Sequence, residues 1–246
     1  GFGKTAIAKY FVKNIGSLSK KNVDITYKYY VCNFNSFTDS FNFQNIIETQ
    51  ISQRVGNKIG PPANTKLIYF LDDLNMPALD KYGTQSHVEL LRQMFDYKEF
   101  YDRKDLDQRK ILEDILFLAS QNPKAGSFKI DLRLQRHFTT LSPSEPKMDV
   151  ISGIYYTILK NHFKDFKFKG FDKKQEEAVS EISQQIINAS CKILDDIRKH
   201  KDFAPNAQKF HYQWNLREVA RIVSGVLRSN NSYYKEFNPV YKLWYH

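Results

Sequence analysis

The sequence predicts an α/β fold, a doubly wound parallel sheet followed by a smaller region made only of helices. Short apolar runs rich in β-branched and aromatic residues alternate with segments of helical periodicity through the first part of the chain. After Pro143 and Pro146 only helical periodicity remains. We therefore expect a large α/β subdomain over residues 1–146 and a small helical lid subdomain over residues 147–246.

The first expected strand covers residues 27–34, a run of aromatic and β-branched residues. A helix should begin at about Asp39, because apolar residues follow at helical spacing: Phe41, Ile46, Ile47, Ile51 and Val55. Residues 56–64 are rich in Gly and Pro and predict a loop or a hairpin.

The central strand is expected over residues 67–71, because this continuous apolar run is typical of a parallel strand buried on both faces. The alternation then continues with a helix over 88–97, a buried strand within 111–119, a short helix over 131–136 and a last strand over 138–141.

The lid subdomain is expected to contain three main helices, over residues 151–163, 176–199 and 215–228. The longest has apolar residues along one face: Val179, Ile182, Ile186, Ile193 and Ile197. Asn215, with Glu218 three residues later, resembles a capping box at the start of the last helix.

The chain opens with Gly-Phe-Gly-Lys-Thr, which matches the second half of a phosphate-binding P-loop. Gly1 and Gly3 would let backbone N–H groups approach the phosphates of a bound nucleotide. Lys4 would reach the β- and γ-phosphates, and Thr5 would ligate Mg²⁺. The following apolar run suits the helix whose N-terminus must hold the anion. The alternative is a Gly-containing start to an ordinary helix.

Two acidic residues, Asp72 and Asp73, follow the central strand and form a Walker B pattern. They lie at the carboxyl end of a parallel strand, where open α/β sheets bind ligands. Asp72 would hold Mg²⁺, mainly through water. Asp73 stands where related ATPases place a Glu that polarises the attacking water, and it is one methylene shorter. The alternative is a strand that ends in a turn capped by both acids.

Three further residues would contact nucleotide if this arrangement is an AAA+ ATPase. Asn122 follows the strand within 111–119 and would orient the attacking water as sensor 1, unless it is only an Asn-Pro turn residue. Arg217 lies in the first turn of a helix, where a cation opposes the helix dipole, so an anion is expected nearby. It would be sensor 2, unless it is a solvated arginine. Arg133, preferred over Arg136, would be the arginine finger for a neighbouring site, unless both arginines form structural ion pairs.

Composition restricts the class of protein. The chain has 246 residues, 41% hydrophobic and 26% charged, which is typical of globular domains. The net charge of +10 and the alternating Lys and Phe residues of 160–169 suggest nucleic-acid binding as an alternative function. We expect those lysines to be solvated and those phenylalanines to be core. Cys32 and Cys191 are expected to be buried thiols in a reducing compartment.

The sequence shows no apolar run of membrane-spanning length and no signal peptide. A nucleotide-binding sheet needs a strand before its P-loop, and none precedes Gly1 here. We therefore expect the chain to be part of a longer polypeptide.

Several long segments closely resemble the heavy chains of dyneins. They read LDDLNMPALDKYGTQ (71–85), LLRQM (90–94) with YDR (101–103), NPKAGSF (122–128), RLQRHF (133–138) and KFHYQWNLRE (209–218). Together they resemble the third AAA+ module of the motor ring, in its axonemal, outer-arm form. The resemblance extends over nearly the whole chain.

The resemblance implies an ATP-fuelled, minus-end-directed microtubule motor of the ciliary axoneme, within the cytoplasm and cytoskeleton. It implies ATP or ADP with Mg²⁺ as ligands. The implied partners are the adjacent AAA+ modules, dynein intermediate and light chains, and microtubules, with no nucleic acid and no membrane. The third module is expected to bind nucleotide and regulate the motor. Because Asp73 replaces the usual Glu, a structural ring module without turnover stays an alternative, as does an AAA+ ATPase acting on nucleic acid.

Overall fold

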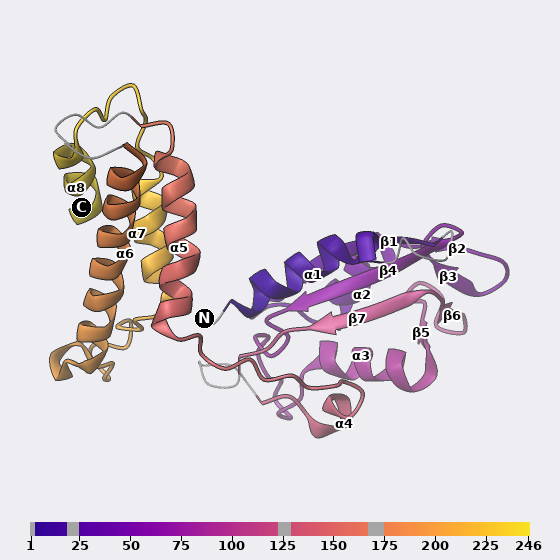
Figure 1. Ribbon diagram of the computed structural model, residues 1–246. Coiled ribbons are helices and arrows are strands. Elements are labelled where there is room, and N and C mark those ends of the chain that lie inside the picture. The colour runs from indigo at the N-terminus through magenta and orange to yellow at the C-terminus, as the bar shows by residue number, and fades with distance from the viewer. Residues whose placement is uncertain (1–2, 19–24, 123–128, 167–174) are drawn as a thin grey trace. The chain divides into compact units, whose positions relative to one another are not determined.

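The chain divides into two compact units, Gly3–Ser142 and Pro143–His246, in a computed structural model (Figure 1). The structure describes residues 3–18, 25–122, 129–166 and 175–246. Each unit has its own cluster of buried apolar side chains, so each forms a core by itself.

The first unit is built on three parallel strands in the order β1-β4-β7. These are β1 (Thr26–Asn33), β4 (Thr65–Asp72) and β7 (Ile115–Ala119). The helices are α1 (Lys4–Leu18), α2 (Ser40–Glu48), α3 (Ser86–Tyr97) and the short α4 (Leu132–Gln135). Helix α1 packs on one face against β1 and β4, and α3 lies on the opposite face (Figure 1). The predicted parallel sheet with helices on both faces is therefore confirmed.

The middle strand, β4, is buried on both faces, as its continuous apolar sequence predicts. Leu67, Tyr69 and Leu71 belong to the core cluster that α2 and α3 complete. Because side chains alternate along a strand, Ile68 and Phe70 point to the face that α1 covers, and both are buried. Tyr69 is fully buried, and its hydroxyl donates to the backbone carbonyl of Ile47 over 2.8 Å, so it ties α2 to the sheet.

A second, smaller sheet has the order β2-β3-β6-β5. Its strands are β2 (Ser52–Gln53), β3 (Lys58–Gly60), β5 (Glu99–Tyr101) and β6 (Arg109–Leu112). β2 and β3 pair antiparallel, which confirms the hairpin expected before β4. All four strands gather at the end of the unit away from the start of α1 (Figure 1).

Two expectations for this unit are wrong in part: the end of the helix that begins near Asp39 and the burial of the strand within residues 111–119. Helix α2 ends at Glu48, and Val55 lies in the turn between β2 and β3 with 89% of its surface exposed. Residues 111–119 do contain the expected strand, β7, which follows the end of β6 after a turn in which Asp114 has a φ of 57°. Strand β7 is only partly buried, because Leu116 is 51% exposed.

The last strand, expected over residues 138–141, is absent as well. These residues have no regular structure, and Leu141 is 84% exposed. A strand requires a neighbour to accept its ladder hydrogen bonds. Within the part of the chain that the structure describes, no strand pairs with this segment.

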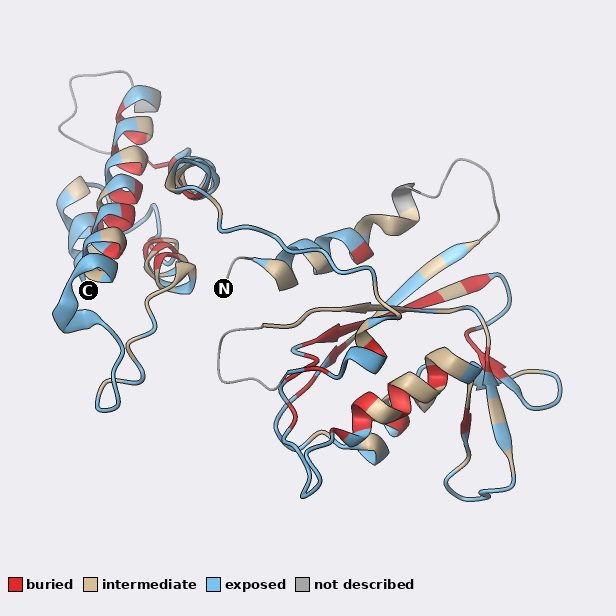
Figure 2. Cartoon of the chain, turned by 90° about the horizontal axis from the view of Figure 1, so that it is seen from below, coloured by how far each residue is buried: buried red, intermediate tan, exposed pale blue. Residues whose placement is uncertain are grey.

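Every regular element described in the second unit is a helix. The unit contains α5 (Met148–Phe163), α6 (Gln175–Lys199), the short 3₁₀ helix η1 (Lys201–Phe203), α7 (Leu216–Val226) and α8 (Phe237–Tyr245). Buried residues recur along α6, as predicted from its apolar face (red in Figure 2). Ile193 departs from that prediction because it is 43% exposed. Phe163 and Phe166 are core residues, as expected for the phenylalanines of the Lys- and Phe-rich segment, whose residues 167–169 lie outside the described part.

A side-chain cap explains where α7 begins. The Asn215 side chain caps α7 by accepting from the backbone N–H of Arg217. Glu218 does not complete the expected capping box but pairs with Arg221.

Cys32 and Cys191 are buried free thiols, and burial raises the pKa of Cys32 to about 12. In the described residues, no helix has the length and apolar character needed to span a membrane.

Candidate nucleotide-binding site

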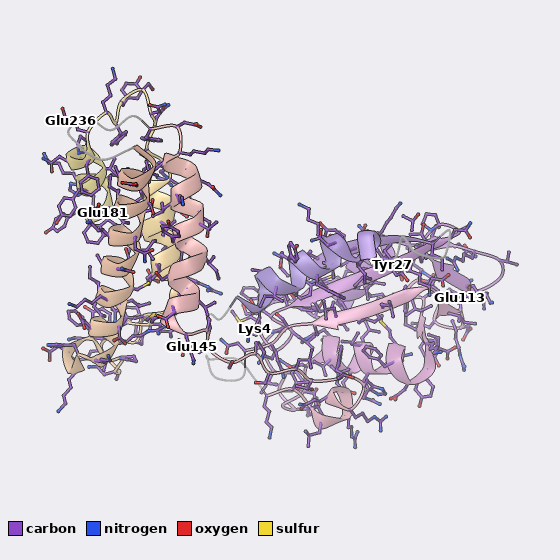
Figure 3. All side chains as sticks on the ribbon, in the orientation of Figure 1. Lys4, Tyr27, Glu113, Glu145, Glu181 and Glu236 are labelled. Carbon is purple, nitrogen blue, oxygen red and sulfur yellow. The ribbon has the colours of Figure 1, made fainter. Side chains whose placement is uncertain are left out.

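The parallel strands β4 and β7 end side by side, and their ends form one edge of the candidate site. Leu71 of β4 is paired with Ala119 of β7, so the residues that follow them, Asp72 and Ser120, are neighbours. Figure 3 shows Lys4 at this end of the sheet, while Tyr27 and Glu113 lie at the other end. The site therefore lies at the carboxyl edge of the sheet, as predicted.

Asp72 is the centre of the site. It is 8% exposed, and its Oδ1 accepts a hydrogen bond from Thr5 Oγ1 over 2.9 Å and another from Ser120 Oγ over 2.5 Å. Hydroxyl and carboxylate oxygens are the ligands that Mg²⁺ prefers, and Mg²⁺ keeps several waters of its own. The described residues contain no cluster of three or more His, Cys, Asp or Glu side chains fit for a metal. The Thr5–Asp72 pair fits a Mg²⁺ ion that also takes phosphate and water oxygens.

Lys4 and the start of α1 provide positive charge beside this pair. Helix α1 begins at Lys4, directly after Gly3, whose φ of 79° is a conformation that favours glycine. The Lys4 ammonium donates to the backbone carbonyl of Gln121, which lies just beyond β7. The first N–H groups of a helix lack partners within it, so this end can hold an anion. Gly1 lies outside the described residues.

Asp73 follows Asp72 but is placed differently. Its side chain is exposed, and its backbone is left-handed with a φ of 57°. Its carbonyl accepts from the N–H of Met76 over 2.9 Å, so Asp73 opens the turn after β4. Asp tolerates this conformation better than most residues with a side chain. The geometry suits a turn residue, and the exposed carboxylate is also accessible to water.

Asn122 is held at the edge of the site by a residue that the sequence analysis did not propose, Asn75. The Asn75 side chain is 2% exposed; its Nδ2 donates to the Asn122 carbonyl over 3.0 Å, and its Oδ1 accepts from the Asn122 N–H over 3.4 Å. Ser120, the hydroxyl donor to Asp72, was also missed. Each of these two residues is polar and follows an expected strand closely, which could have marked it as a candidate. The local sequence does not show which strands are neighbours, so the partners of these side chains could not be predicted from it.

The turn that carries Asn75 is supported from α3. His87 Nε2 donates to the Leu74 carbonyl over 3.0 Å, and Gln85 Nε2 donates to the Pro77 carbonyl over 2.6 Å. Both side chains are buried. His87 Nδ1 has no hydrogen-bond partner among the described residues. Burial lowers the pKa of His87, which therefore stays neutral with its proton on Nε2.

The two candidate finger arginines differ in their contacts. Arg136 forms an ion pair with Asp96 of α3 over 2.8 Å, and Asp96 also contacts His137 and Arg92. Arg133 is exposed on α4, and no ion pair is found for it in the part of the chain described. Arg136 thus has a structural role, while the charge of Arg133 faces solvent.

Arg217 belongs to the helical unit, not to the unit that contains Lys4. It is exposed in the first turn of α7, where its backbone N–H donates to Asn215 Oδ1 over 2.8 Å. The role of Arg217 over nucleotide stays a prediction.

Two family models match separate parts of the chain. Residues 1–146 match the model of the P-loop containing dynein motor region, and residues 196–246 match that of an AAA+ lid domain. The dynein beta chain of the flagellar outer arm of Chlamydomonas reinhardtii is 36% identical over 246 residues, the whole of this chain and 5% of that protein. Human dynein axonemal heavy chain 17 is 38% identical over 213 residues, which is 87% of this chain and 4% of the relative. The ciliary dynein beta chain of Tripneustes gratilla is 34% identical over 247 residues, 100% of this chain and 5% of the relative.

The low pKa of His87 predicts a loss of stability in mild acid. Below the ordinary pKa of about 6.5, the unfolded chain binds a proton that folded His87 resists, so the free energy of unfolding should fall as the pH is lowered from 7 to 5, by up to about 1.4 kcal/mol per pH unit. Urea unfolding at several pH values measures this slope.

The slope should be compared between two variants. In His87→Gln the new amide can still donate to the Leu74 carbonyl, and His211→Gln, which changes an exposed ring, is the control. Only the first should flatten the slope. Burial also lowers the pKa of His162, so part of the slope should persist. Equal slopes in the wild-type chain and in His87→Gln would contradict the assignment.

Proposed function

The chain belongs to the family of P-loop containing dynein motor regions, and on that premise we propose that it is the third AAA+ module of an axonemal, outer-arm-like dynein heavy chain. In this proposal the module binds ATP or ADP with Mg²⁺ and regulates the motor. The observation that carries it is the hydrogen bond from Thr5 to Asp72, with Lys4 adjacent at the start of a helix. Asp72 is distant in sequence from Lys4 and Thr5, and their meeting at one sheet edge is what a Mg²⁺-nucleotide site requires.

The residues take the following roles in the proposed site. Gly1 and Gly3 let the backbone approach the phosphates, and Lys4 neutralises the β- and γ-phosphates. Thr5 and Asp72 hold Mg²⁺, which when bound would neutralise charge on the phosphate oxygens. Asp73 polarises the attacking water, and Asn122 orients it.

Arg217 and Arg133 extend the proposed site beyond this sheet. Arg217 acts on the nucleotide of its own module from the lid. Arg133 reaches the site of a neighbouring module as an arginine finger. We assign the nucleotide-binding subdomain to residues 1–146 and the lid to residues 147–246. The family matches over residues 1–146 and 196–246 support this division.

The wider function is proposed from the relatives, whose names describe flagellar outer-arm, ciliary and axonemal dynein chains. The chain spans 5% or less of each of these proteins. We propose that it serves ATP-driven, minus-end-directed movement along microtubules in the ciliary axoneme. Its partners would be the adjacent AAA+ modules of the same heavy chain, with intermediate chains, light chains and microtubules bound by the whole protein.

A second candidate function is a structural ring module that holds nucleotide without hydrolysis. Asp73 is the observation that favours it, because its carboxylate is shorter than the usual Glu and its backbone opens a turn. Both candidates require nucleotide binding, and they differ only in turnover.

Lys4→Ala should weaken nucleotide binding strongly, because Lys4 supplies the main side-chain cation to the phosphates. Loss of charge-assisted hydrogen bonds predicts an affinity about 10- to 100-fold lower. Titration with a fluorescent ATP analogue measures this in the heavy chain with its other sites blocked. Lys9→Ala removes an exposed lysine of the same helix and should leave affinity unchanged. Equal affinities in the two variants would refute the P-loop assignment.

Asp73→Asn should separate hydrolysis from binding. Asn tolerates the left-handed backbone as well as Asp does, so the turn should persist. Without the carboxylate the attacking water loses its base, and residual turnover should fall about a hundredfold or more. Single-turnover hydrolysis and equilibrium binding, with the other modules' sites inactivated, measure the two effects. If turnover is unaffected, Asp73 is not the base; if the wild-type site shows none, the structural module is correct.

Arg133→Ala and Arg136→Ala form a matched pair on one short segment. Arg133→Ala should weaken the nucleotide response of the neighbouring module and leave binding at this site unchanged, because its charge faces solvent. Arg136→Ala should instead reduce stability, because it breaks the pair with Asp96. Site-specific nucleotide occupancy in structures of the intact ring compares them. A neighbour effect from Arg136→Ala alone would transfer the finger to Arg136.

A further inference from the structure

The hydrogen-bond ladder between β4 and β7 continues beyond the ends of both strands. The Ser120 N–H donates to the Leu71 carbonyl over 2.8 Å, and the Leu74 N–H donates to the Ser120 carbonyl over 3.0 Å. The turn after β4 and the segment after β7 are therefore joined where the candidate site lies. The next connection along this junction is made by a side chain.

That side chain is Asn75, which binds both backbone polar groups of Asn122. Its Nδ2 donates to the Asn122 carbonyl over 3.0 Å, and the Asn122 N–H donates to its Oδ1 over 3.4 Å. The amide thus replaces a backbone strand partner. The Asn75 side chain is 2% exposed, so water could not replace these hydrogen bonds if they were broken. Their loss would therefore lower the free energy of unfolding.

Asn75 is itself held in place on both sides. His87 binds the carbonyl of the preceding residue, Leu74, and Gln85 binds the carbonyl of Pro77. Both donors come from the start of α3 or the residue just before it, and both are buried. The position of the Asn75 amide is therefore determined by packing against α3, not by a mobile loop.

We infer that Asn75 is a positioning residue for Asn122, which it fixes relative to Asp72 and Thr5. The backbone of Asn122 can then not shift without breaking two bonds to a buried amide. This restricts where the Asn122 carboxamide can lie beside a nucleotide. The inference deepens the proposed function, since discrimination of ATP from ADP would require Asn122 at a defined distance from the terminal phosphate.

The first test does not depend on nucleotide. Hydrogen exchange measured in the nucleotide-free heavy chain should show the amides of residues 120–122 exchanging about tenfold faster in Asn75→Ala than in wild type. The amides of β4 should keep their protection. Unchanged exchange at Asn122, or a uniform loss of protection throughout the unit, would overturn the inference, and either result leaves the proposed function standing.

The second test measures discrimination between nucleotides. Asn75→Ala should keep ADP affinity within about twofold and reduce the preference for a non-hydrolysable ATP analogue over ADP about tenfold or more. Asn75→Asp keeps the shape and an acceptor for the Asn122 N–H but loses the donor to its carbonyl. It should resemble Asn75→Ala, because the shorter bond is the one lost. An unchanged preference in Asn75→Ala would refute the positioning role, whereas nucleotide binding that survives Lys4→Ala would refute the proposed function instead.

Discussion

The parallel pairing of β4 with β7 is the constraint on which the first unit depends. Parallel strands bring their carboxyl ends to one edge, and the pairing of Leu71 with Ala119 places Asp72 directly beside Ser120. The same edge receives Thr5 from the start of α1. A change of register by one residue would turn the apolar side chains of β7 to the opposite face and separate the Ser120 hydroxyl from the Asp72 carboxylate.

The edge of the sheet is stabilised by buried polar side chains that bind backbone carbonyls. Asn75, Gln85 and His87 are all nearly inaccessible to solvent. Gln85 and His87 donate to carbonyls of the segment after β4, and Asn75 donates to the Asn122 carbonyl after β7. Such groups stabilise a loop only when they are paired. Helix α3 supports this turn at its start and binds Arg136 through Asp96 near its end. It therefore contacts both the candidate site and the segment that carries Arg133.

The sequence predicted the parts of the site that depend on local order. Lys4 and Thr5 follow glycines, and Asp72 ends an apolar run, so their meeting followed from the fold class alone. Asn75 and Ser120 were missed because their partners are set by which strands are neighbours. The end of α2 was mispredicted because the apolar spacing continues past the helix into the hairpin of β2 and β3, where the backbone direction changes.

Asp73 has two features to reconcile, a left-handed backbone in the turn after β4 and a proposed role in hydrolysis. The residue has a φ of 57°, a conformation in which side chains other than those of Asp and Asn cost about 1 kcal/mol or more. A Glu here would bring a longer carboxylate toward an attacking water, but in a backbone conformation that it tolerates less well. Asp fits the turn that positions Asn75, and Asn75 in turn holds Asn122. If Asp73 is the base that we propose, an Asp in place of the usual Glu favours the geometry of the turn over the reach of the carboxylate. In the function proposed above, this is the balance expected of a module whose nucleotide regulates a motor.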